Sequence, residues 1–330
     1  MKFGPVPVTE AADTILAHSL AVEGGRIRKG RVLTFDDISA LSQAGYSEVI
    51  VARLEANDMG EDAAAEKIAR AMVPDPQAAG VRLSIAATGR VNIFAIGPGV
   101  MGLDVGAVEA ANWVDPLITI ATLAPFSRTG EGTMLATIKI IPYGVSTKSV
   151  EQAADLAANA MRVHPVLMKT ASLLQTGGVS AGGRKGETAI AGRLVALGMH
   201  LAESQSSPHQ VTRLADAIAT STGEVILILT ASATSDLNDV APSAVRQAGG
   251  KITRFGLPVD PGNLLFLGKY EGRPVIGLPG CARSPALNGA DWVLERVVCG
   301  LNVSEADMAA MGVGGLLKDS PARGVPRDKS

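Results

Sequence analysis

Residues 225–229, VILIL, form an unbroken apolar run that is followed at once by the polar stretch 230–239, TASATSDLND. A continuous apolar run of this length predicts a strand that is buried on both faces of a sheet. Helical periodicity begins directly after the polar stretch, at 240–248. A strand, a polar loop and a helix in this order predict an α/β sheet of parallel strands, whose ligand loops follow the carboxyl ends of the strands.

Strands and helices alternate on both sides of this run. We expect strands at 166–174, 199–203, 224–230, 251–256, 264–269 and 274–278, and helices at 187–197, 208–221, 240–248 and 285–299. This rhythm predicts a doubly wound, mostly parallel sheet as the second domain, over 164–315. The polar end of the chain, 316–330, is predicted to be a disordered tail.

The preceding segment, 1–163, is predicted to be a smaller mixed α/β domain. Thr34 can cap a helix that ends at Gly45, and further helices are expected at 60–73 and 148–161. Strands are expected at 49–52, 81–86, 91–96, 117–123 and 134–141. The pair His164-Pro165 marks the predicted boundary, because the residue before proline is pushed out of helical geometry.

The composition excludes several classes of protein. The chain has 330 residues, of which 47% are hydrophobic, and a net charge of −2, so a nucleic-acid partner is not expected. Two cysteines make no disulfide framework, and no run of apolar residues is long enough for a membrane span. The N-terminus lacks the pattern of a signal peptide. We therefore expect a soluble cytoplasmic protein.

Three polar loops follow predicted strands and are the candidate ligand loops. The first, 230–240, holds small hydroxyl residues and Asp239, which could bind a ligand or only cap the next helix. The second, 277–285, places Arg283 and Ser284 before a helix, where an anion could bind, although Arg283 could also be a solvated side chain. The third, 177–186, is rich in glycine and carries Lys185; it could equally be a flexible connector.

The residues of these loops resemble a known family. Thr230 to Ala244, TASATSDLNDVAPSA, aligns without a gap with the signature loop of molybdopterin adenylyltransferases and gephyrin, at Thr230, Asp239, Val240, Pro242 and Ala244. Leu278-Pro279-Gly280 resembles the second signature of the same family, and 261–263 a Pro-Gly step of its members. Residues 24–54 resemble the segment that precedes this domain in molybdopterin molybdotransferases. The chain is most similar to bacterial molybdopterin-binding proteins that carry Pro279-Gly280-Cys281-Ala282-Arg283-Ser284-Pro285, some of them fused to a cofactor cytidylyltransferase-like domain.

The resemblance implies a role in molybdenum cofactor biosynthesis or delivery. In one hypothesis the chain binds molybdopterin or its nucleotide form as a homo-oligomer, and serves a cofactor cytidylyltransferase or a molybdoenzyme maturation protein. In the alternative it is a Mg²⁺-dependent transferase that acts on molybdopterin by nucleotidyl transfer or molybdate insertion, with Asp239 as catalytic residue and metal ligand. A third hypothesis is a regulatory scaffold without ligand. The implied pterin-binding residues are Thr230, Ser232, Thr234, Ser235, Asp239, Pro279, Gly280, Arg283, Ser284 and Lys185.

The chain departs from the family where phosphate would approach the first loop. Ala231, Ser232 and Thr234 replace glycines that let backbone amides come close to phosphate. The hydroxyls of Ser232 and Thr234 could donate hydrogen bonds in their place. The departure favours the binding hypothesis over adenylyl transfer or molybdate insertion.

Several other motifs are weak. The segment 97–102, GPGVMG, matches a dinucleotide fingerprint, but Pro98 removes an amide and 103–105 is expected to continue as a strand rather than to open a helix. The four histidines are scattered and lack metal-ligand spacing, so we expect structural or surface roles for them. Cys281 has no evident base beside it. Residues 88–92 are expected to form a hairpin turn, although they could also face a ligand.

Overall fold

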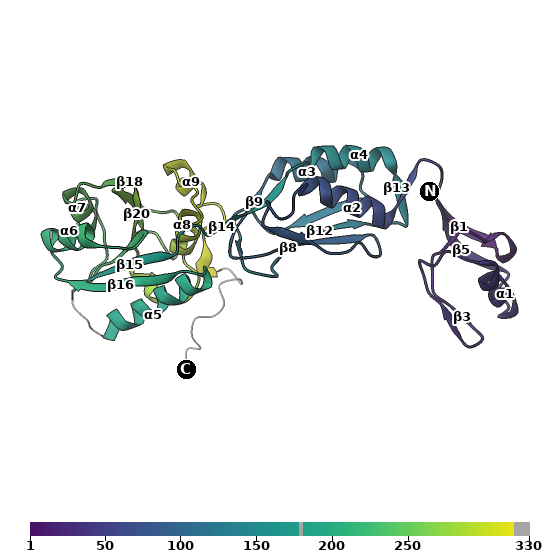
Figure 1. The fold of residues 1–330 in the computed structure, drawn as a ribbon, viewed down its shortest axis with the longest axis horizontal. Coiled ribbons are helices and arrows are strands. Elements are labelled where there is room, and N and C mark those ends of the chain that lie inside the picture. Colours follow the sequence, from purple (N-terminus) through teal and green to yellow (C-terminus); the bar gives the residue numbers. More distant parts are fainter. Residues whose placement is uncertain (178–180, 320–330) are drawn as a thin grey trace. The chain divides into compact units, whose positions relative to one another are not determined.

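The computed structural model describes residues 1–177 and 181–319, excepting the side chains of 181–183 and 319. The chain divides into two compact units, each described here by itself (Figure 1). The first comprises residues 1–97, 101–127 and 131–163, and the second comprises 98–100, 128–130 and the chain from 164 onward. Two short segments from the first half of the sequence therefore belong to the second unit.

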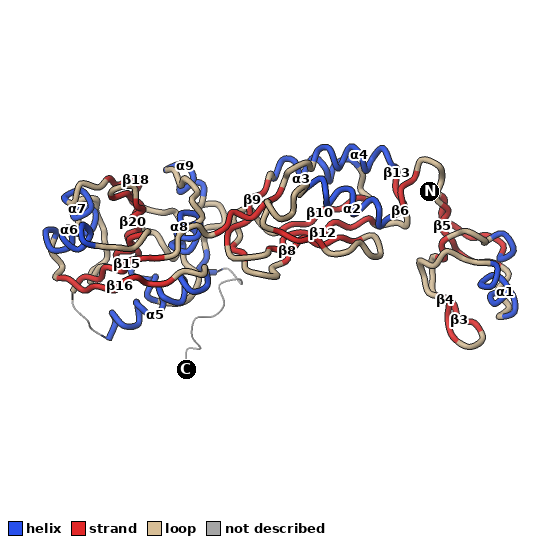
Figure 2. The backbone as a smooth tube through the Cα atoms, viewed as in Figure 1, coloured by secondary structure: helices blue, strands red, loops and turns tan. Residues whose placement is uncertain are grey.

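The first unit combines short strands with four α-helices, which Figure 2 shows in red and blue. Its elements are β1 (Lys2–Pro7), η1 (Val8–Glu10), β2 (Ile15–Leu16), β3 (Leu20–Val22), β4 (Gly25–Ile27), α1 (Phe35–Gln43), β5 (Glu48–Arg53), β6 (Asp58–Gly60), α2 (Glu61–Met72), β7 (Val81–Leu83), β8 (Arg90–Ala95), β9 (Gly99–Leu103), α3 (Val105–Val114), β10 (Ile118–Thr122), β12 (Met134–Ile140), β13 (Gly144–Ser146), α4 (Thr147–Leu156) and β14 (Met161–Pro165).

Two hydrophobic cores hold this unit together. The larger one joins α2, α3 and α4 to the antiparallel sheet β10-β12-β8-β7, around side chains such as Ile68, Ile93 and Ile138. The smaller one gathers Leu16 and Leu41 with their neighbours beneath β1, β2 and β5. Since apolar residues alternate along these strands, one face of each sheet can be buried while the other faces water.

Local capping explains where the helices of the first unit begin. Thr34 caps α1 as expected, because its hydroxyl accepts from the Asp37 amide and the Asp37 carboxylate accepts from the Thr34 amide. The expected strand at 103–105 is wrong in part: β9 ends at Leu103, and Asp104 caps α3 by accepting from the amide of Ala107. The helix expected over 148–161 ends at Leu156, so that the chain enters β14.

The second unit is built on one six-stranded sheet. Its elements are β11 (Arg128–Thr129), β15 (Thr170–Thr176), α5 (Ala181–Ala196), β16 (His200–Ser207), α6 (Val211–Thr220), β17 (Val225–Leu229), α7 (Val240–Gln247), β18 (Lys251–Phe255), β19 (Phe266–Tyr270), β20 (Arg273–Leu278), η2 (Gly280–Arg283), α8 (Gly289–Val298), α9 (Glu305–Ala310) and η3 (Leu317–Asp319). The strand order is β16-β15-β17-β20-β19-β18.

Both faces of this sheet are covered by helices. Leu173, Leu227 and Ile276 point toward α5 and α8, and they share one core with those helices. Leu174, Ile226 and Val275, each one residue away along its strand, share the opposite core with α6 and α7. Figure 1 shows α6 and α7 on one side of β15 and β16, and α5 on the other. The apolar run 225–229 is therefore buried on both faces, as its composition predicts.

The parallel part of the sheet is smaller than expected. Strands β16, β15, β17 and β20 pair parallel with one another, whereas β19 pairs antiparallel with both β20 and β18. The reason is the two-residue turn Glu271-Gly272 between β19 and β20, with φ of 48° and 78°. Two successive positive φ values belong to a tight hairpin turn, which can connect only antiparallel strands. With the antiparallel sheets of the first unit, the chain is a mixed α/β protein with several sheets, most of them antiparallel.

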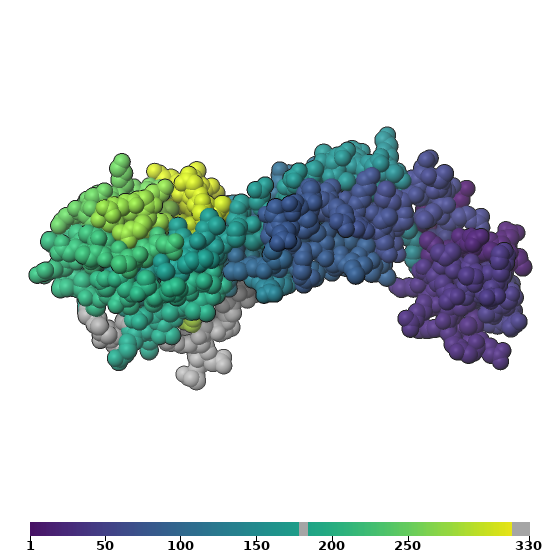
Figure 3. Space-filling model, viewed as in Figure 1, coloured from purple at the N-terminus to yellow at the C-terminus, as the bar shows by residue number. Residues whose placement is uncertain are grey.

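The end of the described chain packs on the second unit. Leu317 is buried, the amide of Lys318 donates to Asp260 at 3.0 Å, and the amide of Asp260 donates to Gly315 at 2.8 Å. In Figure 3 the yellow atoms, which belong to the last part of the described chain, lie against the green atoms of the same unit. Residues 316–318, expected in a disordered tail, are therefore ordered, and the remaining tail from 320 lies outside the described residues. None of the helices in the described ranges is long and apolar enough to cross a membrane.

Candidate functional site

Three parallel strands end side by side at one edge of the six-stranded sheet. Thr176 at the end of β15 pairs with Ser207 of β16, and Gln175 pairs with Leu229 of β17. Strand β15 lies between its two successors in the sheet: β16 pairs with one edge of β15, and β17 pairs with the other. The connections that leave β15 and β16 therefore run in opposite directions across the sheet. In open α/β sheets such a reversal leaves a crevice outside the carboxyl ends of the strands, where ligands bind.

The loop after β17 is held in shape by its own hydroxyl groups. Thr230 and Thr234 are buried; the Thr230 hydroxyl donates to the Ser232 carbonyl at 2.6 Å and lies 3.4 Å from the Thr234 hydroxyl. Ser232 and Ser235 are exposed. Of the replaced glycine positions, Thr234 thus turns inward and Ser232 faces outward. The hydroxyl of Thr234 therefore contacts the loop itself and does not face solvent.

His209, for which a structural or surface role is expected from the sequence, lies beside this loop. Its Nδ1 lies 2.8 Å from the Thr176 hydroxyl, and its Nε2 lies 3.2 Å from the Ser232 hydroxyl. The Thr176 hydroxyl also accepts from the amide of Ala231 at 3.0 Å. His209 therefore joins the carboxyl ends of three strands: Thr176 is the last residue of β15, while His209 and Ser232 lie in the loops after β16 and β17.

Asp239 caps α7. One carboxylate oxygen accepts from the amide of Val240 at 2.7 Å, and the other accepts from the amide of Ser235 at 3.1 Å. Both oxygens thus have backbone partners at the start of a helix, as a capping acid requires. In the described part of the chain, no three His, Cys, Asp or Glu side chains are grouped as a metal site would need.

The loop after β20 approaches the loop after β17 through Arg283. The Arg283 guanidinium donates to the carbonyl of Thr230 at 2.8 Å. Burial lowers the pKa of Arg283, but a guanidinium of this kind remains charged at neutral pH. The expected adjacency of 230–239 and 278–285 is thus present. Pro279 is buried before η2, while Gly280 and Ser284 border a pocket.

The helix expected at 285–299 begins later, at Gly289. Asn288 caps α8, and Asp291 accepts from the Asn288 amide at 2.7 Å to complete a capping box. An anion was expected to bind at the N-terminus of this helix. The carboxylate of Asp291 lies there instead. Arg283 lies on η2, before this helix, so its charge does not act together with the dipole of α8.

A buried arginine fixes the backbone around Arg283. Arg193 of α5 donates to the carboxylate of Asp291 at 2.6 Å and is only 7% exposed. Its remaining N–H groups donate to the carbonyls of Ala189, Ala282, Ser284 and Ala286. The five donors of this planar group are matched to five acceptors. Arg193 thereby holds the chain on both sides of Arg283.

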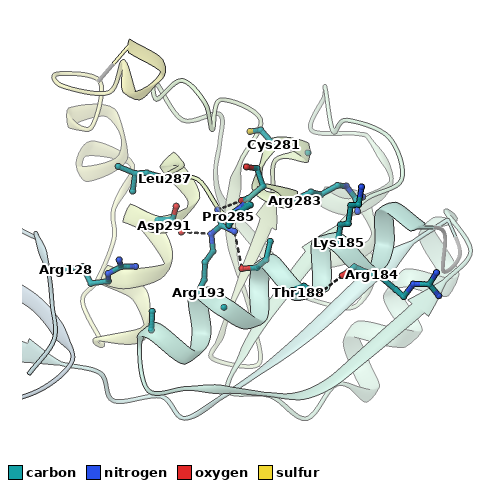
Figure 4. A pocket seen from close by; sticks show the side chains of 15 residues that line it. Arg128, Arg184, Lys185, Thr188, Arg193, Cys281, Arg283, Pro285, Leu287 and Asp291 are labelled. Carbon is teal, nitrogen blue, oxygen red and sulfur yellow. Dashed lines mark hydrogen bonds and ion pairs between the residues drawn. The ribbon is translucent and has the colours of Figure 1, made fainter. Parts of the chain in front are cut away.

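A pocket of about 1200 Å³ lies between α5 and the 280–287 segment (Figure 4). Its cations are Arg184 and Lys185 from the first turns of α5, Arg283 from η2, the buried Arg193, and Arg128 at the other end. The lining acid is Asp291, which pairs with Arg193. The expected glycine-rich connector is helical from Ala181, so that Lys185 is carried by a helix; 178–180 lie outside the described residues.

Arg128 was not anticipated from the sequence, because β11 is remote in the chain. It lies 3.5 Å from Glu295 of α8, whose side chain is 7% exposed. Burial raises the pKa of Glu295 to about 7, against the opposing effect of Arg128. Cys281 also lines the pocket and accepts from the Asn288 amide group at 3.0 Å. Lysine and arginine side chains therefore dominate the charge of the pocket.

The dinucleotide-like segment 97–102 takes no part in this site. Residues from Gly99 form β9 itself, so the glycines do not open a helix for a pyrophosphate. Residues 88–92 form the expected turn, with Thr88 and Gly89 at positive φ and Ala87 bridged to Arg90. Neither segment contributes to the pocket at α5.

Comparison with known proteins gives little that bears on the site. A family model described as "Domain of unknown function (DUF8806)" matches residues 5–53, in the first unit. No curated protein matches the chain. Among solved structures, the chain is similar to the molybdopterin biosynthesis moea protein from Pyrococcus horikosii, with 11% sequence identity and a TM-score of 0.32, over 91% of this chain and 75% of that chain. A likeness of this degree does not identify a ligand or an activity.

Proposed function

We propose that the second unit binds molybdopterin or its nucleotide form, in the biosynthesis or delivery of the molybdenum cofactor. The observation that carries the proposal is the pocket that Arg184, Lys185 and Arg283 line beside the segment 279–284. The resemblance of the loops at 230–244 and 278–285 supplies the identity of the ligand. A terminal phosphate needs several cations and hydrogen-bond donors, and this pocket has them.

The residues present fit such a ligand. Arg283 and Lys185 would bind the phosphate, with the Ser284 hydroxyl as a further donor beside them. Ala189, Pro285 and Leu287 supply apolar surface in the same pocket for a planar ring. We assign the sheet as doubly wound, since helices cover both faces of its parallel strands. That assignment agrees with a ligand site at the carboxyl ends of β15, β17 and β20.

A binding role is preferred to Mg²⁺-dependent transfer because of Asp239. Both of its carboxylate oxygens already accept backbone hydrogen bonds where it caps α7. A hard cation takes six or more oxygen ligands, and a capping carboxylate has little capacity left for one. The bound ligand would then pass to a cofactor cytidylyltransferase or a molybdoenzyme maturation protein, as the resemblance implies.

The substitution Arg283→Ala tests this proposal. A charge-assisted hydrogen bond contributes on the order of 1.5–3 kcal/mol, so its loss should weaken binding roughly tenfold to a hundredfold. Anaerobic calorimetric titration with molybdopterin gives the dissociation constant directly. Arg213→Ala is the matched control, because Arg213 is an exposed arginine of α6 on the opposite face of the sheet. Equal affinities of the parent and Arg283→Ala would place the site elsewhere.

A second measurement asks which ligand the chain carries. Mass spectrometry of small molecules released from the purified protein should show molybdopterin or a nucleotide conjugate. The same preparation of Arg283→Ala should carry less of it, while Arg213→Ala should carry as much as the parent. Release of an unrelated phosphate ester by the parent would refute the assignment of the ligand as a pterin, while the pocket would still be a site that binds anions.

A further inference from the structure

We propose that Thr176, His209 and Ser232 form a nucleophile relay that hydrolyses a phosphoric ester. In this relay Ser232 is the nucleophile, His209 the general base and acid, and Thr176 a positioning residue. The inference goes beyond ligand binding. The nucleophile depends on the relay alone, and the choice of a phosphoric ester depends on Arg283; both hold whether or not the anion bound in the pocket at α5 is a pterin.

The geometry is that of an activated serine. The Ser232 hydroxyl lies 3.2 Å from Nε2 of His209, and Nδ1 of the same ring lies 2.8 Å from the Thr176 hydroxyl. A serine is a weak nucleophile until a base takes its proton, and the base must itself be oriented by a third group. The three side chains supply these roles in sequence, at hydrogen-bond distances.

The hydrogen bonds of Thr176 favour the productive form of the ring. The amide of Ala231 already donates to the Thr176 hydroxyl oxygen at 3.0 Å, and a hydroxyl oxygen can accept two bonds. In the relay the second bond comes from Nδ1–H of His209. Nε2 then carries a lone pair and accepts the proton of Ser232. Because Thr176 is 4% exposed at the end of β15, its position is fixed by the sheet.

Solvent exposure increases from the positioning residue to the base and from the base to the nucleophile. Thr176 is buried, His209 is half-buried, and Ser232 is exposed. The nucleophile therefore faces solvent and any substrate, while the positioning residue is shielded from water. The hydroxyl of Thr230 holds the Ser232 carbonyl at 2.6 Å, which fixes the backbone of the nucleophile.

The cation that contacts the loop of Ser232 favours a phosphoric ester over a carboxylic ester as the substrate. The Arg283 guanidinium donates to the carbonyl of Thr230, two residues from Ser232, at 2.8 Å. Attack on a phosphoric ester needs cations to offset the repulsion between the anionic ester and the nucleophile, and to stabilise the charge of the transition state.

The reaction balances with water as the second substrate. Ser232 Oγ attacks phosphorus while its proton passes to Nε2 of His209, and the bond from phosphorus to the leaving alcohol breaks. The leaving oxygen takes the proton from Nε2, which gives a phosphoserine and a free alcohol. Water then attacks the phosphoserine, giving one proton to His209, which returns it to Ser232 Oγ as phosphate leaves.

A fluorophosphonate probe tests the nucleophile without any assumption about the natural substrate. Activated Ser232 should attack the probe, expel fluoride and form one adduct, which peptide mass spectrometry should locate at 231–233. Ser232→Ala should abolish the adduct, and His209→Asn should slow its formation by at least roughly a hundredfold. Labelling at another serine, or equal labelling of His209→Asn and the parent, would overturn the relay.

Matched controls separate the relay from general effects. Ser206→Ala removes an exposed serine of β16, and His200→Asn removes a histidine at the opposite end of that strand. Both should label at the parent rate. Thr176→Val keeps the size of the side chain and loses the hydroxyl, so labelling should slow by roughly tenfold or more, while Thr176→Ser should restore it. Unchanged labelling of Thr176→Val would remove Thr176 from the relay and contradict the proposal.

Turnover then tests the substrate class. The parent should hydrolyse p-nitrophenyl phosphate, and Ser232→Ala should lower kcat/KM by at least roughly a hundredfold. Hydrolysis of p-nitrophenyl acetate without hydrolysis of the phosphate would overturn the assignment to phosphoric esters. Molybdopterin affinity measured on the parent distinguishes the two proposals, because failure of the relay leaves that affinity in place, and failure of the pterin site leaves the labelling of Ser232 in place.

Discussion

Replacing Glu295 by glutamine should remove a pH dependence from the stability of the second unit. The Glu295 side chain is 7% exposed and lies 3.5 Å from Arg128. Burial raises the pKa of its carboxyl from 4.5 to about 7. The folded protein therefore holds this proton more tightly than the unfolded chain does. The free energy of unfolding should be highest at acidic pH and fall as the pH rises toward 7.

The pKa values set the size of the effect. At roughly 1.4 kcal/mol for each pH unit between 4.5 and about 7, ionised Glu295 lowers the free energy of unfolding by about 3 kcal/mol above pH 7. Glutamine resembles the protonated acid in shape and lacks its titration. At pH 8 the variant should be more stable than the parent by up to about 3 kcal/mol, and at pH 5 by less than about 1 kcal/mol.

The chain offers a convenient spectroscopic reporter for this measurement. It has two tryptophans, Trp113 in the first unit and Trp292 in the second. In a Trp113→Phe background, urea unfolding followed by fluorescence reports the second unit alone. Glu271→Gln, at an exposed turn, is the control and should follow the parent at every pH. A stability difference between Glu295→Gln and the parent that stays constant from pH 5 to pH 8 would refute the reasoning.

Two further substitutions test the framework of the site. Arg193→Ala leaves Asp291 buried without its cation and frees three loop carbonyls, so the second unit should lose about 3–5 kcal/mol of stability in urea unfolding; a loss below about 1 kcal/mol would show that the loop is held by other contacts. Asp239→Asn should cost no more than about 1 kcal/mol, because asparagine also caps helices, and it should leave metal-free pterin affinity unchanged. If Asp239→Asn instead abolished a Mg²⁺-dependent turnover of molybdopterin, the transferase hypothesis would replace the binding role.

Patterns within single elements made much of the fold predictable. The run 225–229 forms a strand that is one residue shorter at each end than the expected 224–230, because an apolar segment of that length has few alternatives to burial. The start of α8 was misplaced because proline at 285 was taken as the first helical residue, whereas the capping pair Asn288 and Asp291 lies just beyond it. The helix α3 was missed for a similar reason, since Asp104 was assigned to a strand although it caps the helix.

The site was less predictable, because it depends on which strands are neighbours. The loops at 230–239 and 278–285 could be paired in advance, since both follow strands of one sheet. His209 could not be added to them from its spacing: it comes next to Thr176 and Ser232 only because β15 lies between β16 and β17. One local signal was available. His209 follows a proline directly after a strand, where ligand loops begin.

Ala231, Ser232 and Thr234 stand where the resembling molybdopterin proteins have glycines, and their contacts differ from those expected. Side chains at 231, 232 and 234 were expected to narrow a phosphate cradle. The methyl group of Ala231 instead lies over Gly177, where an added Cβ would come within 2.5 Å of it, and Gly177 has a φ of 92° that suits glycine. Gly177, in the loop after β15, thus leaves room for Ala231. The Ala231 amide then reaches the Thr176 hydroxyl, and the next residue, Ser232, lies beside His209. A glycine at 232 would leave the histidine without a hydroxyl partner in this loop. Ser232, one of the residues that make adenylyl transfer less expected, is therefore also the nucleophile of the proposed relay.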